Sequence, residues 1–169
     1  GAVGRVVTTV PDSDTEPPAI RPAAQADLLA VHRIESAAFP QPWPFSAFES
    51  YVGEDGFLVA VDDEGDREAV LGYVVADTVP NHGTPLGHVK DLAVHADHRG
   101  RGIGRRLLGR AIGALEDTGA GSVKLEVRIS NEVAISLYRS FGFEHRRTIP
   151  NYYGNGEDAL VMIRALDGE

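Results

Sequence analysis

Apolar residues in the middle of the chain recur with two different spacings. Between residues 122 and 129, apolar and polar residues alternate, which is typical of a β-strand with one buried face. Between residues 101 and 117, apolar residues recur every three or four positions, which predicts an amphipathic helix. Residues 87–94 predict a further strand just before this helix. A strand–helix–strand unit of this kind requires two parallel strands joined by a right-handed crossover.

The same two patterns cover most of the remaining chain. Helical spacing is also found in residues 23–39, 46–52 and 131–141, and Ser46 is a suitable N-cap for the second of these helices. Strand-forming runs on either side of the acidic turn at residues 62–66 predict an antiparallel hairpin. The order of elements indicates a mixed α/β domain. The predicted strands are residues 19–23, 56–63, 67–79, 87–94, 122–129, 143–149 and 157–166.

Length and composition fit one folded domain that follows a tail. Residues 1–18 are rich in proline, aspartate and threonine and are predicted to be mobile, which leaves residues 19–169 for the domain. The formal net charge of −9 argues against nucleic acid as a partner. No apolar stretch is long enough to span a bilayer, so no membrane partner is expected. The absence of cysteine fits a cytoplasmic protein, and the sequence leaves the oligomeric state open.

A glycine-rich segment, RGRGIG at residues 99–104, joins the strand at 87–94 to the following helix. A Walker A loop requires lysine and then serine or threonine after its last glycine, whereas Gly104 is followed by two arginines. A dinucleotide-binding fingerprint requires a third glycine at the position of Leu107. Helix-start amides and clustered arginines in an acidic chain favour a phosphate group. A pyrophosphate-binding loop and a plain turn both remain compatible with this segment.

Three segments, in order along the chain, resemble the GNAT N-acetyltransferase superfamily. Arg99, Gly102 and Gly104 match its Arg/Gln-x-x-Gly-x-Gly/Ala motif at the start of the helix after the fourth strand. LEVRISNEVAISLYRSFGF, residues 125–143, and RRTIPNYYGNGEDALVMI, residues 146–163, are similar to the ribosomal-protein alanine acetyltransferase and archaeal N-terminal acetyltransferase branch. The glycine motif alone indicates the superfamily, and the three segments together indicate the branch.

This resemblance extends from about residue 19 to the C-terminus and implies a fold. It implies a single GNAT-like domain with a mixed, mostly antiparallel central sheet and helices on both faces. The fourth and fifth strands, residues 87–94 and 122–129, form the one parallel pair.

The resemblance also implies an acetyl-CoA site. In this family the glycine loop holds the pyrophosphate, and the preceding strand offers backbone groups to the pantetheine. The resemblance implies that Asn131 hydrogen-bonds the cofactor arm. Asparagine is also a good N-cap for the helix that starts here, and Ser130 is the alternative cap that would leave Asn131 free. No metal is expected, and His95 and His98 are interpreted as surface residues. The residues assigned to acetyl-CoA are Leu92, Ala93, Val94, Arg99, Gly100, Arg101, Gly102, Ile103, Gly104, Arg105 and Asn131.

Glu126 and Tyr138 are the catalytic residues that the resemblance implies. Glu126 lies between Lys124 and Arg128 on the polar face of its strand, where it is either a solvated side chain or the base that takes a proton from an amine. Tyr138 lies on the apolar side of its helix, where it packs in the core, donates a proton to the departing thiolate, or does both. Asp91 is a second candidate for the base.

The implied reaction is acetyl transfer from acetyl-CoA to the α-amine of a protein N-terminus, with a ribosomal protein as one candidate target. Phe39, Trp43, Tyr152 and Tyr153 are expected to wall the peptide groove, although aromatic residues in loops also serve as hydrophobic plugs. The absence of cysteine favours direct attack in a ternary complex. The alternatives are acetylation of a lysine side chain or a small amine, and a CoA-binding module without activity.

Overall fold

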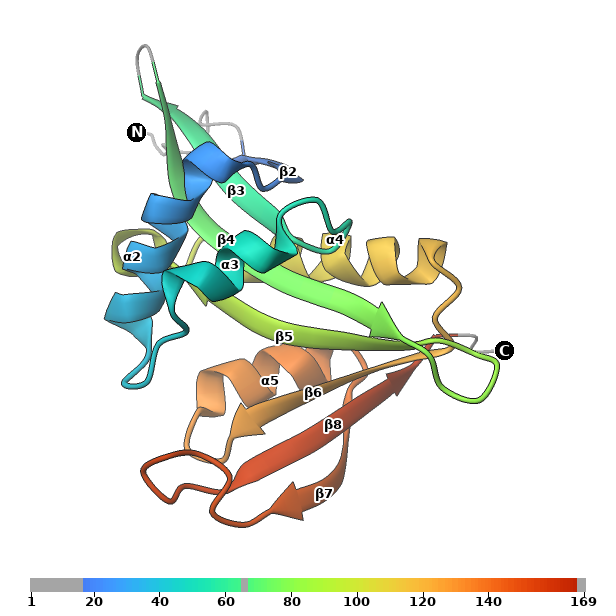
Figure 1. Ribbon diagram of the computed structural model, residues 1–169. Coiled ribbons are helices and arrows are strands. Elements are labelled where there is room, and N and C mark those ends of the chain that lie inside the picture. Colours follow the sequence, from blue (N-terminus) through green and yellow to red (C-terminus); the bar gives the residue numbers. More distant parts are fainter. Residues whose placement is uncertain (1–16, 65–66, 167–169) are drawn as a thin grey trace, which may run out of the picture.

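The computed structural model describes residues 17–64 and 67–166. Within them, seven strands form one sheet in the order β2-β3-β4-β5-β6-β8-β7 (Figure 1). All neighbouring strands are antiparallel except β5 and β6, which confirms the predicted mixed sheet with one parallel pair. The strands are β2 (Ala19–Pro22), β3 (Leu58–Glu64), β4 (Arg67–Val79), β5 (Leu86–Val94), β6 (Ser122–Arg128), β7 (Glu144–Ile149) and β8 (Ala159–Ala165).

Parts of two predictions fall outside the described residues. Of the predicted tail, only Pro17 and Pro18 are described. The predicted hairpin is formed by β3 and β4, whereas residues 65–66 at its turn lie outside the described part of the chain. None of the helices in that part is both long enough and apolar enough to cross a bilayer.

Four α-helices cover the two faces of the sheet in the described chain, as Figure 1 shows. On one face, α2 and α3 enclose a core with β3 and β4 that contains Val31, Phe48 and Tyr73. On the other face, α4 and α5 enclose a second core, in which Leu107 and Tyr138 pack against the sheet. The helices are α2 (Leu28–Ala38), α3 (Phe45–Tyr51), α4 (Ile103–Asp117) and α5 (Glu132–Ser140), and short 3₁₀ turns span Gln25–Asp27 and Ala96–His98.

All four helix starts differ from the predicted ones, and for α2 and α3 the structure shows the cause. The helix expected from residue 23 begins as α2 at Leu28, because Asp27 accepts a hydrogen bond from the Ala24 N–H at 2.8 Å and stabilises a 3₁₀ turn ahead of it. The prediction that Ser46 caps the next helix is wrong. Pro44 occupies the N-cap position of α3 in an extended conformation, and its carbonyl accepts the Ala47 N–H at 3.0 Å.

The sheet splits between its two parallel strands. Residues Leu86 to His88 of β5 pair with Ser122 to Lys124 of β6, and no pairing continues beyond them (Figure 1). On the other side of β5, Val75 pairs with Asp91 and Ala76 with Val89, so Lys90 is an additional residue in a β-bulge. The split exposes the β6-facing backbone of β5 and separates the side chains of the two strands.

Candidate active site

Two cavities meet at the split between β5 and β6. A groove of about 640 Å³ runs between the start of α4 and α5 and includes the glycine loop. A smaller cavity of about 260 Å³ is lined by side chains of β5, β6, the α2–α3 loop and the β7–β8 loop. The linings of both share Phe39, Leu92, Asn131 and Ala134. A ligand in the glycine-loop groove can therefore reach a second ligand in the smaller cavity through the split.

A third groove is larger than either but lies elsewhere. It has a volume of about 700 Å³, lies between α2, β4 and the loop after β5, and is not lined by Glu126 or Tyr138. It shares Val94, His98 and Arg99 with the glycine-loop groove. We place the candidate chemistry at the split rather than in this third groove, because Glu126 and Tyr138 line the smaller cavity at the split.

The glycine loop has the geometry that an anion requires. Gly100 and Gly102 have φ angles of +84° and +78°, in the left-handed region that side chains other than glycine disfavour. Gly102 occupies the N-cap position of α4, and no side chain caps this helix start. The first-turn amides of α4 therefore face the groove without intrahelical acceptors and carry the positive end of the helix dipole.

Most residues assigned to acetyl-CoA line this groove, and Arg101 is the exception. Arg99 donates its Nε–H to the Val94 carbonyl at 3.1 Å, which ties the loop to the end of β5. Arg105 lies over the Phe141 ring at 5.4 Å. The Arg101 guanidinium is 2.9 Å from His98 Nδ1 and does not line the groove.

The end of β5 offers backbone groups to the split. His95 donates its N–H to Leu71 on β4 at 2.7 Å, and backbone groups alternate in direction along an antiparallel strand. By this alternation Ala93 also faces β4, whereas Leu92 and Val94 direct their N–H groups away from it. The Leu92 N–H is bonded to Asp91 Oδ1 at 2.9 Å, so the Val94 N–H is the more available donor.

Glu126 forms a hydrogen-bonded pair with His88 that sequence reasoning missed. Their Oε1 and Nε2 atoms are 2.8 Å apart, and Lys124 Nζ is 3.5 Å from Glu126 Oε2. The hydrogen bond from His88 lowers the pKa of Glu126, although partial burial opposes this effect. The other predicted neighbour, Arg128, turns away and donates to Glu157 at 3.1 Å. The parallel register, which places His88 beside Lys124, was the signal that could have identified this pair.

Tyr138 packs in the core and also reaches the smaller cavity. Its side chain is buried and packs edge-on against Phe143 at 5.9 Å between ring centroids. It also lines the smaller cavity. Burial raises the pKa of Tyr138 well above its ordinary value, and the charge of Asp91 adds to the rise. The phenol therefore keeps its proton at neutral pH.

Asn131 is the N-cap of α5. Its Oδ1 accepts the Ala134 N–H at 3.2 Å, so the interpretation in which Ser130 caps the helix is wrong. Asn131 still lines both cavities, and its side-chain amide nitrogen is not used in the cap. Asparagine can thus fix the start of α5 and donate to a ligand at the same time.

Two carboxyl groups line the smaller cavity, the buried Glu35 and the half-buried Asp91, and sequence reasoning identified only Asp91. Glu35 is 2% exposed and accepts hydrogen bonds from the Trp43 N–H at 2.9 Å and the Tyr73 hydroxyl at 2.5 Å. Asp91, the second candidate base, lies beside them with its Oδ2 at 3.5 Å from the same hydroxyl. Burial and the neighbouring Glu35 raise the pKa of Asp91 well above its usual range. Glu35 lies on the helical stripe that predicted apolar core residues, so its role was not evident.

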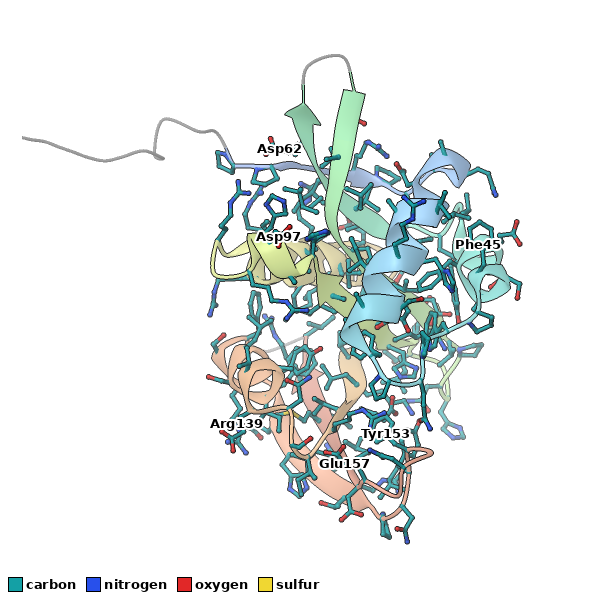
Figure 2. All side chains as sticks on the ribbon, turned by 90° about the vertical axis from the view of Figure 1, so that its left-hand side faces the viewer. Phe45, Asp62, Asp97, Arg139, Tyr153 and Glu157 are labelled. Carbon is teal, nitrogen blue, oxygen red and sulfur yellow. The ribbon has the colours of Figure 1, made fainter. Side chains whose placement is uncertain are left out.

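The predicted aromatic residues divide into two groups. Phe39, Trp43 and Tyr153 line the smaller cavity, whereas Tyr152 is 49% exposed and lies outside the lining. Figure 2 shows Tyr153 and Glu157 on the β7–β8 loop, below the end of α2. The Arg128 guanidinium lies 4.1 Å from the centre of the Tyr153 ring and fixes its orientation.

Histidines near the glycine loop do not form a metal site. The rings of His95 and His98 are 5.5 Å apart, and Asp97 is close to His95. Within residues 17–64 and 67–166, no group of three or more histidine or acidic side chains has the geometry to hold a metal ion.

Comparison with known proteins identifies the family that shares this arrangement. Residues 28–143 match the acetyltransferase (GNAT) family, and this range includes the glycine loop, Glu126 and Tyr138. The chain belongs to the GNAT acetyltransferase family. The likeness of the glycine loop to this family's motif therefore reflects common descent.

Individual relatives are similar to this chain over most of its length. An N-alpha-acetyltransferase of Sulfolobus acidocaldarius is 37% identical over 159 residues, which cover 87% of this chain and 92% of the relative. The ribosomal protein bS18-alanine N-acetyltransferase of Escherichia coli is 34% identical over 139 residues, which cover 80% and 89%. An uncharacterised protein of Mycobacterium leprae is 37% identical, but the chain spans only 42% of its length.

Two solved structures also superimpose on this chain. The ribosomal-protein-S18-alanine N-acetyltransferase of Escherichia coli superimposes with a TM-score of 0.73 at 32% identity and covers 87% of this chain and 92% of its own. A chain of the NatC complex bound to Gag peptide and CoA superimposes with a TM-score of 0.83. At 22% identity, that second likeness shows a shared fold.

Proposed function

We propose that this protein transfers the acetyl group of acetyl-CoA to the α-amine of a protein N-terminus. The observation that carries the proposal is the junction of two cavities at the split, with Glu126 and Tyr138 both lining the smaller one. The relatives named N-alpha-acetyltransferase and bS18-alanine N-acetyltransferase support this acceptor. A ribosomal protein is one candidate target, and we place the reaction in the cytoplasm.

The glycine-loop groove would hold acetyl-CoA. The first-turn amides of α4, which begin at Ile103, would bind the pyrophosphate, and Arg99 and Arg105 would add positive charge. The Val94 N–H, at the unpaired side of β5, would donate to the thioester carbonyl and stabilise the negative charge that develops there. The side-chain amide of Asn131 would contact the pantetheine arm from the opposite wall.

The smaller cavity would hold the peptide N-terminus. Phe39, Trp43 and Tyr153 enclose it with apolar surface, which suits the first side chain of a peptide. The negative charge of Glu126 would attract the α-ammonium group to the split. The Glu126–His88 pair would then take the proton that the amine releases, either directly or through a water molecule.

In the transfer itself, the amine lone pair attacks the thioester carbonyl carbon, the C–N bond forms and the C–S bond breaks. The sulfur leaves as a thiolate and takes the phenolic proton of Tyr138, which burial keeps in its protonated form. The second proton of the attacking nitrogen passes to the Glu126–His88 pair after the first has been released to solvent. When the products leave, this second proton returns through solvent to the Tyr138 phenolate, so one proton is released in each turnover. No acyl-enzyme is required, because both substrates meet at the split.

Peptide acetylation read by mass spectrometry tests the proposal. The substrates are one peptide with a free N-terminus and an internal lysine, and the same peptide with its N-terminus blocked. We expect one acetyl group on the α-amine of the first peptide and none on the second. Acetyl groups on lysine alone would contradict the proposed acceptor, and binding of acetyl-CoA with no transfer to any amine would contradict an enzymatic role.

A further inference from the structure

Lysine is rare in this chain and is confined to the candidate active site. The chain has 16 cationic residues, of which only Lys90 and Lys124 are lysines. Lys124 forms an ion pair with Glu126, and Lys90 lines the smaller cavity. The chain as a whole carries a formal net charge of −9, so positive charge at this cavity opposes the overall field.

Lys90 and Arg128 are the two cationic residues that line the smaller cavity, and their bonding differs. Arg128 is satisfied, because it donates to Asn155 and Glu157 and stacks on Tyr153. The nearest carboxylate to Lys90 Nζ is Asp77 at 3.9 Å, which is beyond hydrogen-bonding distance. Across the described chain, we find no hydrogen bond from this ammonium group, although its side chain is only 23% exposed.

The surroundings hold Lys90 in position through a loose ion pair with Asp77, and they leave the hydrogen-bond donors of its ammonium group without an acceptor. Its Nζ lies 5.9 Å from the centre of the Tyr51 ring, which favours a cation. Because Lys90 is the additional residue of the β5 bulge, its side chain falls on the same face as Asp91, toward α3. A mostly buried ammonium group whose N–H donors lack acceptors is energetically unfavourable. A bound anion that accepts hydrogen bonds from it would remove this penalty.

Lys90 also acts on the same mouth of the cavity as Glu126. Burial raises the pKa of Tyr152, the charge of Glu126 adds to this rise, and the charge of Lys90 opposes it. Opposite charges therefore flank one exposed aromatic residue where a peptide would enter. Strand geometry places Lys90 roughly 7 Å along β5 from His88, which is about two residues of extended peptide.

We propose that Lys90 selects acceptor peptides with an acidic side chain at the second or third residue. The α-amine would lie at the Glu126–His88 pair, and the peptide carboxylate would accept hydrogen bonds from the Lys90 ammonium. The inference rests on the proposed N-terminal acetyltransferase function and adds a substrate class to it. The two lysines thus have different roles, because Lys124 lies beside Glu126 at 3.5 Å, whereas Lys90 is only loosely paired with Asp77 at 3.9 Å and keeps its donors for the substrate.

A set of isosteric peptides tests this selection. Each peptide carries either glutamate or glutamine at position two or position three, and kcat/KM is measured for each at fixed ionic strength. The wild-type protein should favour the glutamate peptide by about tenfold at one of these positions, because an ionised acceptor forms a stronger hydrogen bond than an amide. Equal rates for both members of each pair would overturn the inference.

Two substitutions assign the preference to Lys90. In Lys90→Met the ratio of glutamate to glutamine rates should fall to about one, and in Lys90→Glu a peptide with lysine at that position should become the better substrate. Arg110→Met, which removes an equal charge from an exposed position on α4, is the matched control and should keep the wild-type ratio. A preference that persists in Lys90→Met would overturn the role of Lys90.

The inference and the proposed function fail in different ways. Acetylation of α-amines without any preference for glutamate would overturn the inference alone. Absence of α-amine acetylation from every peptide of the set would overturn both. A preference for glutamate that falls as much in Arg110→Met as in Lys90→Met would assign it to the overall field rather than to Lys90.

Discussion

At the scale of single residues, the candidate site depends on groups that meet across the split. Glu126 comes from β6 and His88 from β5, and each is less than one-fifth exposed. Neither residue is informative alone, because a glutamate on a strand face is usually solvated. Their hydrogen bond at 2.8 Å gives the carboxylate a fixed direction and a stable negative charge. It follows that the two residues should be tested together.

Substitution of this pair should change both the rate and its dependence on pH. Glu126→Gln removes the proton acceptor and should lower kcat by about 10²-fold or more. Because His88 lowers the pKa of Glu126, the carboxylate of the wild-type protein stays ionised below its ordinary range. In His88→Phe this pKa should rise, so the part of the kcat profile that follows Glu126 should move to higher pH.

Steady-state kinetics between about pH 4 and 8 at saturating substrates measure this shift, and Glu116→Gln on the exposed side of α4 is the control. A profile in His88→Phe that coincides with that of the wild type would contradict the coupling.

Tyr138→Phe should separate the packing and chemical roles of this side chain. The ring remains in its pocket against Phe143, and the hydroxyl has no hydrogen bond within the described chain, so the free energy of unfolding should change by less than about 1 kcal/mol. Loss of the phenolic proton should lower kcat by about 10²-fold with little change in the KM for acetyl-CoA. Urea unfolding and steady-state kinetics make the two measurements.

Tyr51→Phe provides the matched control for Tyr138→Phe, because Tyr51 stacks on Trp43 and does not line the cavity. If both variants kept the wild-type rate, Tyr138 would be a core residue only.

At the scale of elements, the start of α4 is where we propose that the fold and the binding of acetyl-CoA depend on the same residues. Gly102→Ala should destabilise the protein by about 1–2 kcal/mol, because alanine is strained at a φ of +78°. It should also weaken CoA binding, since relief of that strain turns the first-turn amides away from the groove. Gly113 lies within the same helix, where an added methyl group would meet open space, so Gly113→Ala should stabilise the protein by about 0.5–1 kcal/mol.

Urea unfolding and calorimetric titration with CoA distinguish these two variants. Weaker CoA binding in Gly113→Ala, or unchanged binding in Gly102→Ala, would contradict the assignment of the loop.

Element types were largely predictable from the sequence, whereas their ends and irregularities were not. Hydrophobic spacing predicted α4 and β6 because each buries one regular face. It failed at Ser46, where the fixed φ of Pro44 starts the helix earlier than a hydroxyl cap would. It also gave no sign of the bulge at Lys90, because that bulge is defined by the pairing of β5 with a partner strand.

The candidate site was predictable where a motif is contiguous. The glycine loop and the positions of Glu126 and Tyr138 follow from local segments, and all of them line or adjoin the split. His88 and Glu35 were missed because their roles depend on partners 38 residues away in the chain. Arg101 was included because it lies within the motif, yet its side chain turns to His98.

At the scale of the whole molecule, the split divides the sheet into two parts, and a hydrogen bond between two loops joins these parts again beside the smaller cavity. Direct pairing of β5 with β6 is limited to three residues of each strand. Across the smaller cavity, the Gly154 N–H donates to Gln41 Oε1 at 3.0 Å and links the β7–β8 loop to the α2–α3 loop. Among the described residues, this is the hydrogen bond that joins the two loops, so it helps to set the width of the smaller cavity, where we propose that the peptide binds.

Removal of this link should affect the peptide and not the cofactor. Gln41→Ala loses a hydrogen bond worth about 1 kcal/mol, so the KM for the acceptor peptide should rise by about fivefold. Gly154→Ala should have the same effect, because its methyl group would displace the Gln41 amide. The KM for acetyl-CoA should not change, since neither residue lines the glycine-loop groove. Gln25→Ala, which removes an exposed contact to Glu49, is the control. If the KM values for the peptide and for acetyl-CoA rose together, this prediction would be contradicted. The Gln41–Gly154 hydrogen bond would then support the fold on both sides of the split rather than the smaller cavity alone.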